Sequence, residues 1–299
     1  MTRDRRILLL GADGQVGKAL QRALPEVGVV EAWGRRQADL EAPDALRARI
    51  RCFAPDVIVN AAAYTAVDKS ESNEAQAHAV NAIAPGAIAQ EARALGALFV
   101  HYSTDYVFDG TRAGPYDETD PVNPLGAYGR TKLEGERAIA AAGCRHLIFR
   151  TSWVYGNEGV NFMKTMLRLA GERDHIRVVA DQIGAPTSSD AIAHATARCL
   201  GAPPASPETG TEPLCGVYHM TCGGETSWYG FACAVFETFL GKDAISRLRI
   251  EPIATADYPT PAKRPRNSVL SNAKLLRDFG VALPGWREAL NQVHAQAIA

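Results

Sequence analysis

Apolar positions follow two alternating patterns over the first 150 residues of the chain. Short runs rich in Val, Ile and Leu are typical of buried strands, whereas apolar residues that recur every three or four positions predict helices buried on one side. A regular alternation of strand and helix favours parallel strands joined by right-handed crossovers. We expect strands at residues 7–10, 27–33, 57–59, 98–102 and 147–150, and helices near residues 16–24, 46–53, 73–95 and 127–142.

A glycine turn lies between the first predicted strand and the first predicted helix, and it reads GADGQVG. Glycine permits a tight turn, lets backbone N–H groups approach a pyrophosphate, and leaves the helix N-terminus aimed at its charge. Between a strand and a helix, this pattern predicts a dinucleotide site and a Rossmann-type doubly wound parallel sheet of the α/β class. The expected cofactor contacts in the turn are Gly11, Gly14, Gln15, Val16 and Gly17.

The regular alternation loosens after residue 155, where longer loops begin. We therefore predict an NAD(P)-binding domain over residues 1–155 and a smaller, less regular substrate lobe over residues 156–299, with part of about 172–200 returning to the sheet. Residues 201–213 contain four prolines and are expected to form an exposed loop that leads to a strand at residues 217–220.

Two arginines, Arg35 and Arg36, follow the second predicted strand, where NAD-binding proteins of this fold usually carry an acidic residue. Guanidinium groups form forked, charge-assisted hydrogen bonds with phosphate, so they favour NADPH, which carries a 2′-phosphate. Glu31 or Asp39 could instead bind the ribose hydroxyls, and NADH therefore stays open as the cofactor.

Tyr128 and Lys132 are four residues apart in a predicted helix, so their side chains share one face. A neighbouring ammonium favours the phenolate, and we expect Lys132 to lower the pKa of Tyr128. Downstream of a glycine turn, this pair predicts an acid–base site. Thr104 follows the strand at residues 98–102, where ligands bind in open α/β sheets, and its hydroxyl could orient a substrate oxygen.

Composition argues against several other functions. The 299 residues carry 32 basic and 33 acidic side chains, a net charge of -1 that disfavours nucleic acid or a membrane surface as a partner. No apolar run approaches the roughly 18 residues of a spanning helix and no cleavable apolar segment follows the N-terminus, so we expect a cytoplasmic protein. The six cysteines form no C-x-x-C pair and no metal site is predicted.

Several motifs together resemble the extended short-chain dehydrogenase/reductases and, more narrowly, the dTDP-4-dehydrorhamnose reductase family. Besides the glycine turn and the Tyr128–Lys132 pair, the motifs span nearly the whole chain. They are NAAAYTAVD from Asn60, HYSTDYVFDG from His101, FRTSWVYG from Phe149, Asn161-Phe162, DQIGAPT from Asp181 and RPRNS from Arg264.

The resemblance implies that hydride from a nicotinamide reduces the 4-keto group of a dTDP-linked sugar, dTDP-4-dehydro-β-L-rhamnose. It implies that Tyr128 supplies the proton, that Lys132 holds the nicotinamide ribose and that Thr104 binds the reacting oxygen. It allows a homodimer, and it is the sole reason to consider Mg²⁺, because the acidic residues are scattered. Further cofactor contacts implied are Asp39, Leu40, Ala63, Tyr64, Thr65 and Tyr102.

The expected substrate contacts are Thr104, Asp105, Trp153, Asn161, Gln182, Arg264 and Asn267. Trp153 follows a strand end, where stacking on a sugar and core packing are both consistent with its position, and the resemblance favours the sugar. Arg264 and Asn267 could bind a diphosphate or lie in a solvated loop, and Gln182 could simply close a turn. We expect His101 to be a packed, hydrogen-bonded histidine and Trp228 to belong to a helix core.

Two other functions fit the same residues. A nucleotide-sugar 4-epimerase or 4,6-dehydratase shares the Tyr–Lys pair, although Tyr106 stands where a dehydratase-like Asp-Glu pair would have its glutamate. A regulatory subunit that resembles the β subunit of methionine adenosyltransferase would keep the cofactor fold without catalysis. The presence of Thr104, Tyr128 and Lys132 argues for an enzyme.

Overall fold

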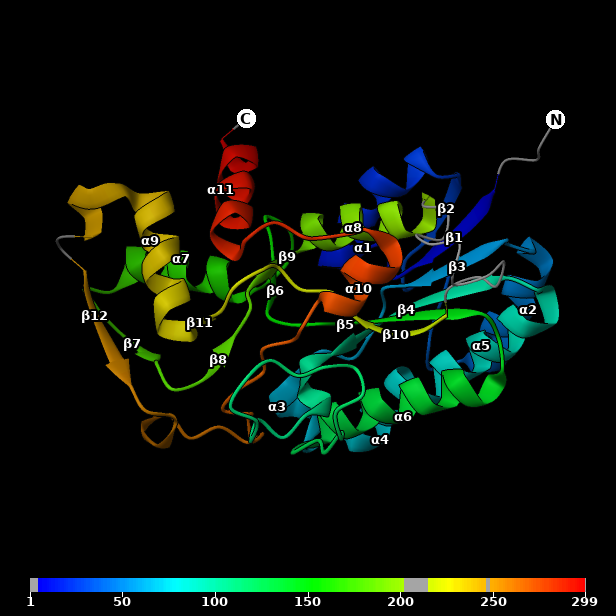
Figure 1. The fold of residues 1–299 in the computed structure, drawn as a ribbon, viewed down its shortest axis with the longest axis horizontal. Helices are drawn as coiled ribbons and strands as arrows, with labels where there is room; N and C mark the ends of the chain where they lie inside the picture. Colours follow the sequence, from blue (N-terminus) through cyan, green and yellow to red (C-terminus); the bar gives the residue numbers. More distant parts are fainter. Residues whose placement is uncertain (1–4, 202–214, 246–247, 299) are drawn as a thin grey trace.

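The computed structural model describes residues 5–201, 215–245 and 248–298, and a six-stranded sheet forms its centre. All neighbouring strands are parallel and follow the order β2-β1-β3-β4-β5-β10 (Figure 1). The predicted doubly wound sheet is thereby confirmed. The strands are β1 (Arg6–Leu10), β2 (Val29–Trp33), β3 (Val57–Asn60), β4 (Leu98–Thr104), β5 (His146–Thr151) and β10 (Gly216–His219).

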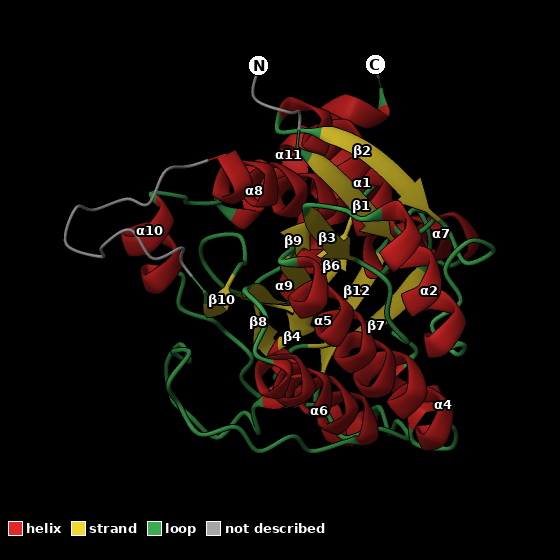
Figure 2. Cartoon of the chain, turned by 90° about the vertical axis from the view of Figure 1, so that its right-hand side faces the viewer, coloured by secondary structure: helices red, strands yellow, loops and turns green. Residues whose placement is uncertain are grey.

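Helices cover both faces of the sheet because successive strand residues point to opposite sides. On one face Ile7 and Leu9 pack against α1 (Gln15–Ala23), α8 (Ser189–Gly201) and α10 (Ala273–Phe279). On the other face Leu8 and Leu10 pack against α2 (Pro43–Phe53), α5 (Ala84–Leu95) and α6 (Ala127–Ala142). Figure 2 shows the two helical layers from the side. Both α8 and β10 come from the second half of the chain.

A second lobe, at the left of Figure 1, has its own apolar core. Aromatic residues of its helices, among them Phe162, Phe231 and Trp286, pack together there. The helices are α7 (Phe162–Glu172), α9 (Trp228–Ile245) and α11 (Trp286–Ala297), and the short strands are β6 (Val154–Tyr155), β7 (His175–Val179), β8 (Ile183–Gly184), β9 (Thr187–Ser188), β11 (Thr226–Ser227) and β12 (Arg249–Ile253).

The helix expected over residues 73–95 is interrupted. It divides into α4 (Glu74–His78), a π-helical turn η2 (Ala79–Ile83) and α5, and it is preceded by α3 (Val67–Ser70). Pro85 has no N–H group and cannot donate to the carbonyl of Asn81, so the regular ladder is broken there. The other predicted elements begin and end within three residues of their expected bounds, and most of the predicted loop at residues 201–213 lies outside the described residues.

The strand order determines where a ligand can bind. The chain builds β2 on one side of β1 and β3, β4 and β5 on the other. In open α/β sheets the crevice at such a reversal, outside the carboxyl ends of the strands, is the usual ligand site. The residues that follow β1, β3, β4 and β5 therefore meet at one edge of the sheet.

Candidate active site

A cleft of about 810 Å³ opens at this edge, between the carboxyl ends of the strands and the second lobe. Its size suits a cofactor together with part of a substrate. The predicted site residues that line it are Gly11, Gly14, Gln15, Val16, Arg35, Asp39, Leu40, Ala63, Tyr64, Thr65, Tyr102, Thr104, Asp105, Tyr128, Lys132, Trp153 and Arg264. Gly17, Arg36, Asn161, Gln182 and Asn267 lie outside this lining.

The glycine turn brings the N-terminus of α1 to one end of the cleft. Gly11 has φ +80° and lies so close to the backbone of Ala62 that a Cβ would come within 2.5 Å of its nitrogen. A Cβ at Gly17 would collide with the carbonyl oxygen of Gly11. No side chain caps the N-terminus of α1, where Gly14 is the N-cap residue. This arrangement suits an anion such as a pyrophosphate.

The two arginines after β2 have different positions. Arg35 lines the cleft, and its guanidinium contacts Glu41 at 3.0 Å, whereas Arg36 is exposed outside the lining. Of the two acidic residues that could instead bind the ribose, Asp39 lines the cleft. Glu31 lies outside the lining and accepts a hydrogen bond from the indole of Trp33 at 3.1 Å. Of the two arginines, Arg35 is thus the one that lines the cleft.

Asn81, which the sequence reasoning missed, holds the loop that carries Ala63, Tyr64 and Thr65. Its side-chain oxygen accepts from the N–H of Tyr64 at 2.9 Å, and its amide donates to the Tyr64 carbonyl at 3.1 Å. The same amide also donates to Thr131 on α6 at 3.2 Å. The sequence contains one signal that could have identified Asn81: a polar residue stands inside an apolar helical pattern, four residues before a proline.

Tyr128 and Thr104 approach each other from α6 and from the end of β4. The Thr104 hydroxyl donates to Asp105 at 2.9 Å and accepts from the N–H of Tyr106 at 3.2 Å. Burial raises the pKa of Tyr128 to about 12, and its hydrogen bond with Thr104 opposes the shift. Tyr128 therefore holds its proton at neutral pH, as a proton donor must.

The expected effect of Lys132 on Tyr128 was wrong for this state of the protein, because burial dominates the pKa of the phenol. The Lys132 amine instead donates to the carbonyl of Tyr102 at 2.6 Å and contacts a ring nitrogen of His101 at 3.2 Å. Lys132 is 1% exposed, and burial lowers its pKa to about 8. A lysine with this pKa carries its positive charge for a smaller fraction of the time near pH 8 than the exposed lysine on which the sequence argument relied.

Asp105 is a buried carboxyl group at the same edge, 2% exposed. Burial raises its pKa to about 7, although hydrogen bonds from Ser268 and Thr104 oppose the shift. Within the described residues its second oxygen, Oδ2, has no hydrogen-bond partner. Asp105 thus changes charge near neutral pH beside the proposed proton donor.

Trp153 and Trp228 form a stacked pair on the second-lobe side of the cleft. Their ring centroids lie 3.6 Å apart with planes inclined by 7°. Trp153 has φ +45°, a strained conformation for a residue with a side chain. A Cβ at Gly184 would come within 2.6 Å of the Trp153 ring, so glycine at this position leaves room for the indole. Trp228, expected in a helix core, belongs to the cleft lining as well.

Three polar residues of the second half of the chain, which we expected to contact the substrate, hydrogen-bond to other residues of the protein. Gln182 donates to Thr255 at 3.1 Å, and Asn267 donates to the carbonyls of Arg112 and Gly114, both at 2.9 Å. Asn161 caps α7 by accepting from the N–H of Lys164 at 3.0 Å, and it donates to Gln15 at 2.8 Å. These side chains close turns and join the two halves of the chain.

Arg264 faces the cleft but already has an anionic partner. Its guanidinium pairs with Asp68 at 2.8 Å, and that pairing holds the pKa of the Asp68 carboxyl below its usual range. Arg264 remains part of the cleft lining with Tyr106 and Trp228. A diphosphate bound near Arg264 would therefore share its guanidinium with Asp68.

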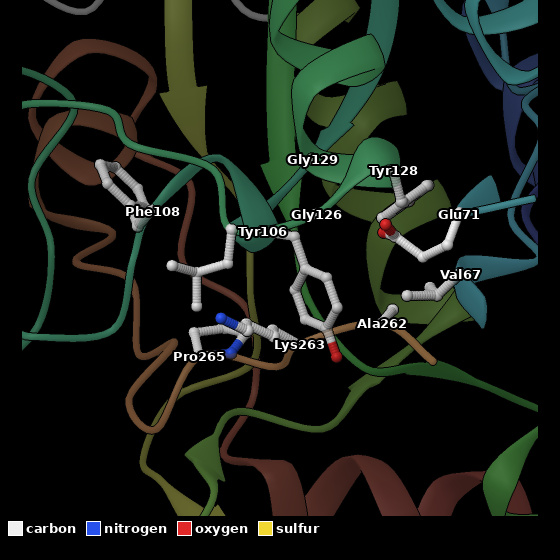
Figure 3. Close-up of a pocket in the computed structure, with 11 residues that line it drawn as sticks. Val67, Glu71, Tyr106, Phe108, Gly126, Tyr128, Gly129, Ala262, Lys263 and Pro265 are labelled. Carbon is white, nitrogen blue, oxygen red and sulfur yellow. The ribbon is translucent and has the colours of Figure 1, made fainter. Parts of the chain in front are cut away.

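A second, small cavity of about 10 Å³ lies behind Tyr128, and it is large enough for about one water molecule (Figure 3). Tyr106 reaches across it toward Ala262 and Lys263, and its ring meets that of Tyr128 edge-on at 5.9 Å. Glu71, also in the wall, accepts from the N–H of Ala127 at 2.7 Å and so fixes the first turn of α6. The position of Tyr128 is thereby set from two sides.

The described ranges contain neither a metal-binding cluster nor a membrane-spanning helix. No group of three or more His, Cys, Asp and Glu side chains there could hold a metal ion. Among the helices of those ranges, none combines the length and apolar character that crossing a bilayer requires.

A glycine turn at the head of a parallel sheet and a Tyr-x-x-x-Lys pair beside a strand-end threonine define a Rossmann-type protein of the short-chain dehydrogenase/reductase class. Comparison with known families makes the assignment narrower. The chain belongs to the family described as the RmlD substrate binding domain, whose model matches residues 5–298.

Individual relatives cover almost all of the chain. It is 50% identical over 288 residues to a dTDP-4-dehydrorhamnose reductase of Burkholderia thailandensis, covering 95% of this chain and 96% of that protein. It is 44% identical over 294 residues to the enzyme of the same name from Escherichia coli, covering 96% of each. A crystal structure of the Bacillus anthracis dTDP-4-dehydrorhamnose reductase in complex with NADP is 33% identical, with a TM-score of 0.88 and coverage of 98% and 99%. The resemblance predicted from the motifs is confirmed.

Proposed function

We propose that this protein reduces the 4-keto group of dTDP-4-dehydro-β-L-rhamnose to dTDP-β-L-rhamnose with NADPH. The observation that carries the proposal is the hydroxyl of Tyr128 beside that of Thr104, in a cleft that ends at the glycine turn. Relatives at 44–50% identity named for this reaction support the choice of substrate. We also propose that the enzyme acts in the cytoplasm, as the sequence predicts.

The residues present fit a dinucleotide. The uncapped N-terminus of α1 and the close backbone approach at Gly11 provide a cradle that a side chain would fill. Arg35 would bind the 2′-phosphate, while Asp39 and the loop at Tyr64 would line the adenosine and ribose. Lys132 would hold the nicotinamide ribose. When bound, NADPH supplies the hydride that reduces the carbonyl carbon.

The side chains of this chain supply the proton and hold the reacting oxygen. Tyr128 Oη gives its proton to the ketone oxygen as the carbonyl carbon is reduced, and Thr104 Oγ1 holds that oxygen in line. The N–H of Tyr106 holds the Thr104 oxygen in place, and to bind the ketone oxygen the Thr104 hydroxyl would turn its proton from Asp105 to the substrate.

The substrate lobe, residues 156–299 in the predicted division, would close over the nucleotide sugar together with Trp153. We propose that the stacked rings of Trp153 and Trp228 form a rigid wall for the sugar. Asp105 would accept from or donate to a sugar hydroxyl through the oxygen that has no partner among the described residues. Arg264, shared with Asp68, would bind the diphosphate.

The test is the absorbance of the reduced nicotinamide in mixtures of purified protein, NADPH or NADH, and freshly generated dTDP-4-dehydro-L-rhamnose. A matched reaction contains dTDP-4-dehydro-D-glucose. We expect oxidation with the rhamnose-series ketone and faster oxidation of NADPH than of NADH, because Arg35 lines the cleft.

Other outcomes separate the alternatives. An epimerase or dehydratase returns its hydride within one catalytic cycle, so neither gives net oxidation of the nicotinamide. A regulatory subunit binds the cofactor and oxidises none of it. Cofactor binding without oxidation by either ketone would contradict the proposed reductase.

A further inference from the structure

His101 lies in the middle of β4 with both ring nitrogens in contact with polar groups. It is 1% exposed. Its Nδ1 is 3.2 Å from the side-chain nitrogen of Asn60 on β3, and its Nε2 is 3.2 Å from the amine of Lys132 on α6. The histidine is packed and hydrogen-bonded, as its sequence context predicts, but one of its partners is the lysine proposed to hold the cofactor.

The orientation of Asn60 determines which ring nitrogen of His101 carries the proton. Asn60 Oδ1 accepts from the N–H of Ala62 at 3.1 Å, so the NH₂ group of Asn60 is the end that faces His101. An NH₂ group only donates, and His101 Nδ1 must therefore accept. Burial lowers the pKa of His101 well below its usual value, so the ring is neutral. Its proton then resides on Nε2.

This tautomer directs an N–H group at the Lys132 amine. The amine already donates to the Tyr102 carbonyl at 2.6 Å, and it can accept from Nε2–H only through the lone pair of its uncharged form. Protonation of Lys132 would require His101 to move its proton to Nδ1 and to give up the hydrogen bond from Asn60. The three side chains are thus coupled.

The charged groups around Lys132 do not offer a competing partner. On α6 itself, Glu136 lies one turn further on, but it is bound to Arg150 of β5 at 2.7 Å and to Ser103. Tyr128 lies one turn before Lys132 and holds its proton. Asp105 follows β4 and accepts a hydrogen bond from the Thr104 hydroxyl at 2.9 Å. Among the described residues, His101 and the Tyr102 carbonyl are the groups recorded in hydrogen-bond contact with the amine.

We propose that His101 is a positioning residue for Lys132: at alkaline pH its Nε2–H donates to the uncharged amine and holds it at the cofactor end of the cleft in the cofactor-free protein. The inference rests on the proposed role of Lys132 at the nicotinamide ribose. Its structural part, the tautomer of His101, can be measured without any turnover, so its failure is distinguishable from failure of the proposed reductase.

The first test is a long-range ¹H–¹⁵N correlation spectrum of the cofactor-free protein at pH 9, where Lys132 is largely uncharged. The His101 signals are assigned by their loss in His101→Gln. We expect the Nε2–H tautomer. The Nδ1–H tautomer or a charged ring would overturn the proposal.

The second test compares His101→Gln, which retains an N–H donor and a carbonyl acceptor, with His101→Leu, which retains neither. For His101→Leu we expect the KM for NADPH at pH 9 to rise about tenfold, the equivalent of one buried hydrogen bond. His101→Gln should recover most of that loss. A purely structural histidine would lower the thermal midpoint in both variants and leave this KM unchanged, and that result would also overturn the proposal. If His101→Leu does not fold, the spectrum of the unsubstituted protein decides.

Discussion

Removing one oxygen atom from Tyr128 tests the proposed proton donor with little change in shape. Tyr128→Phe keeps the ring and its edge-on contact with Tyr106 at 5.9 Å. It removes the hydroxyl whose pKa of about 12 keeps it protonated at neutral pH. Loss of a general acid typically costs a factor of about 10² to 10⁴ in rate, equivalent to about 3 to 5 kcal/mol in the activation barrier.

The assay is NADPH oxidation at saturating substrate, together with a fluorescence titration of NADPH binding. We expect kcat to fall by this factor and the Kd of NADPH to change less than threefold. Tyr218→Phe is the matched control, because it removes another buried tyrosine hydroxyl that donates to Asp278 at 3.2 Å and lies outside the cleft lining. A Tyr128→Phe enzyme that retains more than a tenth of the original turnover would refute the assignment.

Three further predictions concern the cofactor end of the cleft and its pH response. Gly17→Ala should abolish NADPH binding, because its Cβ meets the Gly11 carbonyl, whereas Gly171→Ala, with open space around it, should leave the titration unchanged. Arg35→Ala should weaken NADPH about tenfold and spare NADH, and equal losses would contradict a 2′-phosphate contact. The raised pKa of Asp105, about 7 against an ordinary 3.8, means that the folded chain binds the extra proton between these values. Stability therefore falls as pH rises through this range, and Asp105→Asn should raise the thermal midpoint more at pH 8 than at pH 4.

The parts of the fold that depend on local pattern were predictable from the sequence. Strand β1, the turn at Gly11 and helix α6 follow from apolar runs, glycine spacing and helical periodicity. The interruption before α5 was missed because an Ala-rich segment keeps its helical period through the π turn. The absent N–H of Pro85 was the local signal, but its effect depends on how the carbonyl of Asn81 is placed.

The site was predictable where it lies on regular elements and less so where it depends on contacts between distant segments. The spacing of Tyr128 and Lys132 places both in the cleft. It could not predict that burial, rather than the lysine, sets the pKa of Tyr128, because burial depends on the whole fold. Asn267 carries the expected polar group, but its amide donates to two backbone carbonyls of the protein. The pairing of Trp153 with Trp228 brings together residues 75 positions apart, which no local pattern reveals.

The most direct test of the central claim is the position of a transferred label. The protein is incubated with dTDP-4-dehydro-L-rhamnose and NADPH that carries two deuterium atoms at the reactive nicotinamide carbon, one on each face, and the sugar product is analysed by NMR and mass spectrometry. We predict one deuterium at carbon 4 of dTDP-L-rhamnose and one equivalent of NADP⁺. A product without deuterium, or a converted sugar without net formation of NADP⁺, would contradict the proposed reductase.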